Sequence, residues 1–137
     1  MIDTQTLGTG IISLYAGSSG ATLRGFTGNS KLFQGLASQA TALPLITFTM
    51  IDDMNDDTFG EEISVCRVQF TIWTQLAATN NTGSIQRALR NLYHGIALTL
   101  SGYTHIGTQY LSTRDLGIDE NNRSQVVMDF YIWTQKT

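Results

Sequence analysis

Charged residues are scarce in this sequence: they make up 14% of its 137 residues, against about 25% in an average globular protein. Lys and Arg number 8 and Asp and Glu 11, so the formal net charge is -3. Binding to nucleic acid through phosphate neutralisation needs clustered basic residues, and this balance argues against it. Neutral polar residues take the place of charge, since the 19 Thr equal all charged residues together. Such a surface loses little on desolvation and suits a protein that contacts many neighbours.

Cysteine, proline and long apolar runs are scarce as well. The single cysteine, Cys66, has no partner for an internal disulfide, so the fold does not require an oxidising compartment. No stretch approaches the roughly 18–20 apolar residues that span a bilayer. The first residues lack a basic segment followed by an apolar one, so they do not predict a signal peptide. We expect a soluble protein, assembled in a reducing cell interior, with no membrane partner.

The apolar residues that are present suffice for one core. They make up 42% of the chain, and a chain of this length buries roughly 68–70% of its extended surface on folding. A length of 137 residues fits one domain, and no linker-like stretch divides it. We therefore expect a single domain over residues 1–137.

Hydrophobic periodicity predicts the order of the elements. Helical spacing predicts helices over residues 4–16 and about 84–97, with a short helical turn near 18–25. Alternation of apolar and polar residues predicts strands over 45–51, 63–75, 103–113 and 124–135, with a short extended piece at 31–35. Loops between successive strands are too short for crossover helices. The predicted fold is therefore α+β, with a mainly antiparallel sheet of about four to five strands and two helices packed on one face.

Two of these segments repeat each other. FTIWTQ at 70–75 recurs as FYIWTQ at 130–135, and each copy carries a Trp near the end of its strand, Trp73 and Trp133. One short match does not make a repeat protein. It predicts two neighbouring or equivalent strands of one sheet.

Residues with catalytic chemistry do not form a recognisable constellation. The two histidines, His94 and His105, have no carboxylate or thiol at metal-ligand spacing, and Cys66 alternates in phase with Val68 and Phe70 as a core residue would. The glycine spacing of 20–25 matches a phosphate loop, but Phe26 stands where the lysine is needed. The sequence therefore predicts no enzyme activity, no bound metal and no cofactor.

Acidic residues concentrate between the strands predicted at 45–51 and 63–75. Six of the eleven lie there: Asp52, Asp53, Asp56, Asp57, Glu61 and Glu62. An EF-hand starting at Asp53 would place Thr58 where glycine is required. A cation site of another kind is one alternative, and a solvated hairpin loop held open by like charges is the other.

The whole order of segments resembles one known family. An amphipathic N-terminal helix and an acidic loop accompany KLFQG (31–35), ALPLITFTM (42–50), VQFTIWTQ (68–75), IQRALRNLYHGI (85–96), YLSTRDL (110–116) and VVMDFYIWTQ (126–135). This pattern resembles the tail-completion or tail-terminator proteins of tailed bacteriophages, also called tail-to-head joining proteins. It spans nearly the full chain and contains no invariant motif. The glycine-rich first helix and the long segment 17–30 depart from the family pattern.

The resemblance implies a structural virion protein without catalytic residues. Its members are α+β subunits that form rings, typically hexamers, which cap the tail tube and meet the head connector. The implied partners are further copies of this chain, the tail-tube protein and the connector proteins, with DNA only as passing cargo. The implied location is the tail or neck of the virion, assembled in the host cytoplasm. The alternatives are another neck component (a head–tail stopper, an adaptor or a tail-tube subunit) or a small-molecule-binding or enzymatic α+β domain.

Two groups of residues are candidates for contacts in such a ring. The six acids named above are predicted to lie in the lumen or on one rim, because a surface that repels phosphate lets DNA pass. The second group is predicted to contact neighbouring subunits or partners. It consists of two large residues expected on the surface, Trp73 and Trp133, and two basic residues off the apolar stripe of the second predicted helix, Arg87 and Arg90.

Overall fold

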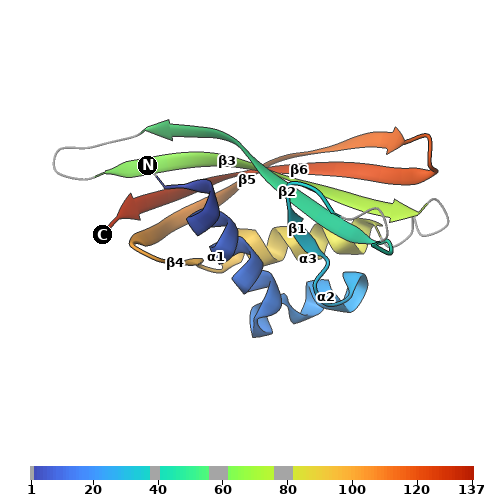
Figure 1. Ribbon diagram of the computed structural model, residues 1–137, viewed down its shortest axis with the longest axis horizontal. Coiled ribbons are helices and arrows are strands. Elements are labelled where there is room, and N and C mark those ends of the chain that lie inside the picture. Colours follow the sequence, from blue (N-terminus) through green and yellow to red (C-terminus); the bar gives the residue numbers. More distant parts are fainter. Residues whose placement is uncertain (1, 38–40, 56–61, 76–81) are drawn as a thin grey trace.

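The computed structural model describes residues 2–37, 41–55, 62–75 and 82–137. Three α-helices lie on one face of a twisted sheet whose long strands run across the molecule (Figure 1). The helices are α1 (Thr4–Ala16), α2 (Ala21–Thr27) and α3 (Thr82–Gly95), and a 3-10 turn, η1 (Ser18–Gly20), joins the first two. The α+β class is confirmed, but the described residues form three helices and not the two predicted, because the turn expected near 18–25 contains the short helix α2.

The sheet has six strands in the order β1-β2-β3-β6-β5-β4. Their bounds are β1 Leu32–Gln34, β2 Leu45–Asn55, β3 Ile63–Gln75, β4 Thr99–Leu100, β5 Tyr103–Ile118 and β6 Arg123–Lys136. The four long strands, β2, β3, β6 and β5, are antiparallel to one another, whereas β1 runs parallel to β2. The sheet is thus mixed and larger than the four to five strands predicted, because two- and three-residue strands give almost no periodic signal.

The repeated segments lie side by side. β3 and β6 pair along their whole length, from Ile63 opposite Gln135 to Gln75 opposite Arg123. Because the two strands are antiparallel, the two Trp residues lie at opposite ends of this pair. The prediction that FTIWTQ and FYIWTQ belong to neighbouring strands is confirmed.

Aromatic residues from three strands and one helix form the centre of the core. The Phe70 ring lies 5.7 Å from Phe48, 4.9 Å from Tyr93 and 5.5 Å from Phe130, measured between centroids. The stripe of α3 packs on this cluster through Ile85, Leu89 and Leu92, all buried. Ile96 was predicted to continue the stripe, but α3 ends at Gly95 and Ile96 is 37% exposed.

Glycines in the first helical segment allow close packing that a side chain would prevent. A Cβ on Gly20 would lie 2.0 Å from the backbone oxygen of Tyr15, and one on Gly10 would lie 2.5 Å from a methyl of Leu100. The chain can therefore turn sharply from α1 into η1, and α1 can lie directly on β4. The Arg24 side chain donates to the carbonyl oxygens of Tyr15 and Gly17, which closes the end of α1. Segment 17–30 is thus a compact helical corner.

The surroundings of Cys66 and His105 are typical of residues that stabilise the fold. Cys66 is fully buried on the helix-facing side of β3, and burial, with the nearby charge of Asp53, raises the pKa of its thiol to about 12. His105 accepts a hydrogen bond from the Leu98 backbone N–H at Nδ1, so its proton lies on Nε2, 2.7 Å from Thr108 Oγ1. Burial lowers the pKa of His105, which favours this neutral form.

Candidate interaction surfaces

In the part of the chain that the structure describes, no helix covers the face of the sheet opposite α1, α2 and α3 (Figure 1). Alternation along the strands assigns to it the residues between the buried core positions. They are mostly neutral and polar on the long strands: Thr47 and Thr49, Gln69 and Thr71, Gln125 and Gln135, Thr104 and Gln109. We call this the open face. Its uncharged character agrees with the low charge of the whole sequence.

One charged cluster lies at the centre of the open face. Asp129 on β6 is 1% exposed, and its Oδ2 accepts a hydrogen bond from Arg67 Nη2 at 2.6 Å. Arg114 on β5 lies 3.9 Å from the same oxygen. The hydrogen bond to Asp129, together with its charge, raises the pKa of Arg67. Within the described part of the chain, the second oxygen of Asp129 has no hydrogen-bond partner. Asp129 therefore offsets one of the two positive charges that lie beside it.

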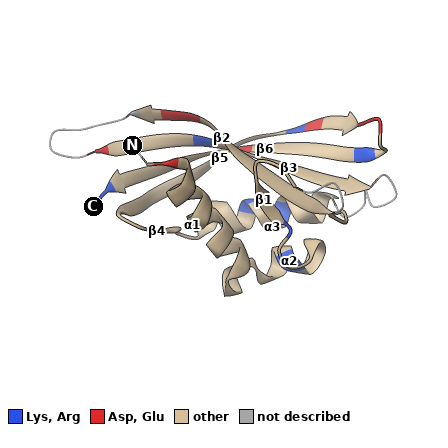
Figure 2. Ribbon diagram, in the orientation of Figure 1, with Lys and Arg blue, Asp and Glu red and all other residues tan. Residues whose placement is uncertain are grey.

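The predicted acidic loop is in part a strand. β2 continues to Asn55, so Asp52 and Asp53 lie on β2 opposite Arg67 and Cys66, which corrects the prediction that they belong to a loop. Glu62 directly precedes β3, and its Oε2 lies 4.0 Å from Lys136 Nζ. Asp56, Asp57 and Glu61 lie outside the described residues. Figure 2 shows acidic residues at both ends of the long strands. Asp115 lies near the end of β5, and Asp119 and Glu120 lie in the turn between β5 and β6.

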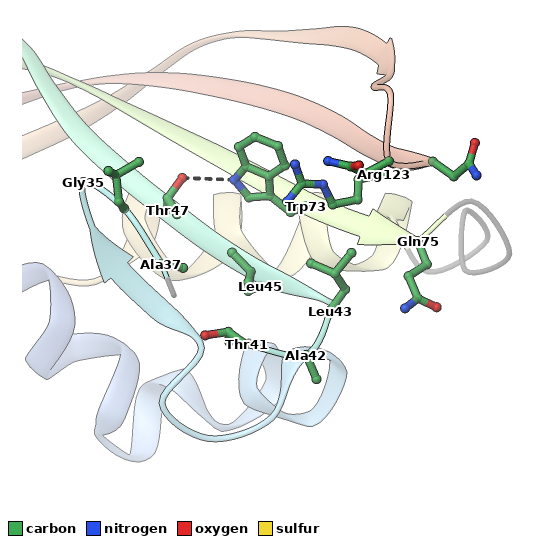
Figure 3. A pocket seen from close by; sticks show the side chains of 13 residues that line it. Gly35, Ala37, Thr41, Ala42, Leu43, Leu45, Thr47, Trp73, Gln75 and Arg123 are labelled. Atoms are coloured by element: carbon green, nitrogen blue, oxygen red, sulfur yellow. Dashed lines mark hydrogen bonds between the residues drawn. The ribbon is translucent and has the colours of Figure 1, made fainter. Parts of the chain in front are cut away.

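Trp73 lines a groove at the end of the sheet where β5 and β6 connect. Its indole Nε1 donates to Thr47 Oγ1 at 3.1 Å, and the Arg123 guanidinium lies 5.1 Å from the ring centroid. The groove has a volume of about 1220 Å³. Figure 3 shows Trp73 and Arg123 along one side and the Leu43–Leu45 segment along another. Trp73 is half-buried there, not fully exposed as expected.

The other three candidate contact residues are separated in the fold. Trp133 lies half-buried on the open face near the far end of β6, where its ring meets Tyr131 edge-on at 5.8 Å. Arg87 and Arg90 are exposed on α3, in the helical layer, and Arg90 lies over the Tyr110 ring at 4.6 Å. The structure therefore does not bring Trp73, Trp133, Arg87 and Arg90 into a single site.

The two long edges of the sheet are a surface that the sequence did not indicate. β4 pairs only with Tyr103 and Thr104, and β1 covers β2 only at residues 46–48. In the described residues, the rest of β5 and the end of β2 have no strand on their outer side. Five of the nine large apolar residues that are well exposed lie on these two strands and none on β3 or β6: Ile51, Met54, Ile106, Leu116 and Ile118.

Across 2–37, 41–55, 62–75 and 82–137, no three His, Cys, Asp or Glu side chains gather as a metal site would require. In those ranges, no helix is both long and apolar enough to cross a membrane.

A family model and a solved structure both match this chain over most of its length. A family model described as tail completion protein gp17 matches residues 16–135. The chain belongs to this tail completion family. A solved structure with the same fold comes from the virion of a native gene transfer agent particle, with a TM-score of 0.82 and 12% sequence identity, covering 97% of this chain and 99% of that one. Among curated proteins, no sequence matches.

Proposed function

We propose that this protein is the tail terminator: its copies close into a ring, a hexamer, at the head-proximal end of the tail tube and join the tube to the head connector. Family membership supports a role in completing the tail. The fold supports ring closure, because the sheet ends in two open edges that face opposite ways. In this role it has no catalytic step, cofactor or membrane partner. It is assembled in the host cytoplasm, and DNA only passes through it.

The open edges are the observation that carries ring closure. Unpaired strand edges tend to associate, and natural proteins either protect or pair them. A contact between two different surfaces of the same chain is heterologous, and a heterologous contact closes into a ring when the rotation permits. Two edges on opposite sides of one sheet fit that arrangement. The tube protein and the connector proteins then contact the two ends of the ring.

The acids at the β2 end of the sheet give this ring an electronegative rim or lumen. Asp52 and Asp53 are exposed near the end of β2, and Glu62 precedes β3 at the same end of the sheet. We place Asp56, Asp57 and Glu61 in the same rim or lumen because they connect these two strands in the sequence. Like charges repeated around a narrow ring add their fields, so DNA phosphates do not adhere there. Salt screens this repulsion over about 8–10 Å but leaves it effective at the wall.

Reversing charge at this end is expected to hinder DNA passage without affecting the fold. Asp52→Lys should lower the free energy of unfolding by about 1 kcal/mol or less, because the side chain is exposed and the only new like-charge neighbour on the paired strand is Arg67. Particles carrying it should release DNA more slowly and infect less well. The matched control is Glu120→Lys, the same charge change on an exposed residue at the other end of the sheet. Equal infectivity of both variants would contradict the acidic rim.

The four contact residues have separate roles in this proposal. Trp73 and its groove lie at the end of the sheet where β5 connects to β6. Trp133 lies toward the opposite end, where β2 connects to β3. Each Trp is therefore available to a different neighbour along the tail axis. Aromatic residues of this kind are enriched among the residues that dominate binding energy. Arg87 and Arg90 lie in the helical layer, where they contact the neighbouring subunit or a connector protein.

Omitting this protein distinguishes a terminator from the alternatives. A terminator stops growth of the tube, so particles made without it should have tails longer than normal and unjoined heads. Without a stopper or adaptor, tails keep their normal length and heads lose DNA. Without a tube subunit there are no tails. Electron microscopy of particles from a deletion strain measures tail length directly, and tails of normal length, or none, would contradict the terminator role.

A further inference from the structure

The pairing of β5 with β6 is interrupted three times at regular intervals. Register shifts fall between His105 and Gly107, between Tyr110 and Ser112, and between Asp115 and Gly117. The residue skipped each time is apolar and five positions from the next: Ile106, Leu111 and Leu116. Such bulges in an edge strand re-aim side chains and are features of the fold rather than defects.

Each bulge adds an apolar residue to the open face. The positions flanking the first bulge, His105 and Thr108, pair with Thr134 and Ile132, which lie on the helix-facing side of β6. The two residues between them, Ile106 and Gly107, therefore both fall on the open-face side. The same alternation applies to Leu111 with Ser112 and to Leu116 with Gly117. A large apolar residue beside a small one thus recurs along this edge.

The opposite edge has a matching feature. In the described residues, the pairing of β2 with β3 has one register shift, which skips Ile51. Ile51 is 45% exposed, and Met54 further along the strand is 47% exposed. Rows of paired residues connect the two edges. Met54 lies opposite Val65, Val65 opposite Trp133, and Trp133 opposite Gly107, the neighbour of Ile106. Met54 and Ile106 are therefore at the same height on opposite edges of one sheet.

Strand direction and charge favour contact between unlike edges. The four long strands alternate in direction, so β2 of one copy and β5 of the next are antiparallel when copies are related by rotation about an axis along the strands. Residues 49–54 contain two acids and no base, whereas residues 105–110, at the same height on the other edge, contain no acid. Two β2 edges together would bring four acids into contact, which like-charge repulsion opposes.

We propose that the subunit contact of the ring joins the bulged β2 edge of one copy to the bulged β5 edge of the next, with Met54 of the first against Ile106 of the second. This contact rests on the proposed ring function and names the surfaces that close it. The apolar residues beside small ones form the dry centre of the contact, and neutral polar residues of both edges surround it. The bulges and charges keep either edge from pairing with unrelated strands.

Cysteine cross-linking in assembled particles tests the contact. Met54→Cys with Ile106→Cys in one chain should react with a short bis-maleimide to give a ladder of covalent multimers. Either single variant should stay monomeric on a denaturing gel, since like edges do not meet. The wild type should also stay monomeric, because its one cysteine is buried. Met54→Cys with Leu116→Cys is the matched control, since Leu116 lies about 30 Å further along the edge at 3.3 Å per residue.

Three results would overturn the contact: no ladder from Met54→Cys with Ile106→Cys, dimers from a single variant, or a stronger ladder from the Leu116 control. The length of a complete ladder also counts the subunits. A ladder ending at another number contradicts the hexamer and keeps the contact. If native mass spectrometry shows a six-copy ring but cross-linking gives no ladder, the ring is supported and the proposed contact is refuted.

A polar substitution gives a second, independent test. Ile106→Asp, at an exposed site, should fold normally but enter particles roughly tenfold less or worse, as loss of a central interface residue does. Ile12→Asp is the matched control, since Ile12 is an exposed apolar residue on α1, away from both edges. Normal incorporation of Ile106→Asp, or equal loss with Ile12→Asp, would also overturn the proposal.

Discussion

Replacing Phe70 by Ala is expected to lower the free energy of unfolding by about 3–5 kcal/mol. Phe70 is fully buried on a central strand, and its ring contacts Phe48, Tyr93 and Phe130. Removing it leaves a cavity among three aromatic rings, two of them on neighbouring strands. Denaturant titration followed by circular dichroism measures the change.

Thr71→Ala is the control for that measurement. Thr71 is the next residue of β3, on the open face and half-buried, so its replacement should change stability by about 1 kcal/mol or less, the span of strand propensity. Similar losses from Phe70→Ala and Thr71→Ala would mean that the core does not centre on this ring.

Replacing Leu89 by Ala is expected to lower the free energy of unfolding by about 2–5 kcal/mol. Leu89 is fully buried in the middle of the apolar stripe by which α3 packs on the sheet. The same titration measures it, with Arg87→Ala as the control. Arg87 is exposed on the same helix, so its loss should change stability by about 0.5 kcal/mol or less. A loss below about 1 kcal/mol for Leu89→Ala would place the stripe away from the core.

The central elements were predictable because their patterns are long and regular. β3 begins and ends at the predicted residues 63 and 75. Its thirteen residues alternate for long enough that only one set of them can face the core. The helix-facing residues Cys66, Val68, Phe70 and Ile72 are all fully buried. α1 also has the predicted bounds despite Gly8 and Gly10, because packing against β1 and β4 compensates for weak helix propensity.

The strand lengths and the edges were not predictable in the same way. β5 extends five residues past the predicted end at Thr113, because its bulges break the alternation that marks a strand. Because of the same bulges, the search for strand periodicity did not indicate the apolar edge. Its period of five residues is nevertheless present in the sequence, as the pairs IG, LS and LG at 106–107, 111–112 and 116–117. A search for this period, and not only for two or 3.6, could have indicated it.

The sequence indicated the cluster of acidic residues but not the secondary structure that carries them. The apolar–polar alternation that predicts the strand ends at Ile51, so the sequence predicts a loop at Asp52 and Asp53. In the fold they extend β2 beyond its apolar part, at an end of the sheet where both faces are open enough for charged side chains to stay hydrated. The partners Trp73 and Arg123 were likewise unpredictable, because fifty residues separate them in the chain.

The number of copies in each particle tests the terminator role most directly. Quantitative mass spectrometry of purified particles measures this chain against the tail-tube protein. A single closed ring predicts a small fixed number, about six copies, whatever the length of the tail. A copy number that rises in proportion to the tube protein in particles with longer tails would contradict the terminator and identify a tube subunit instead.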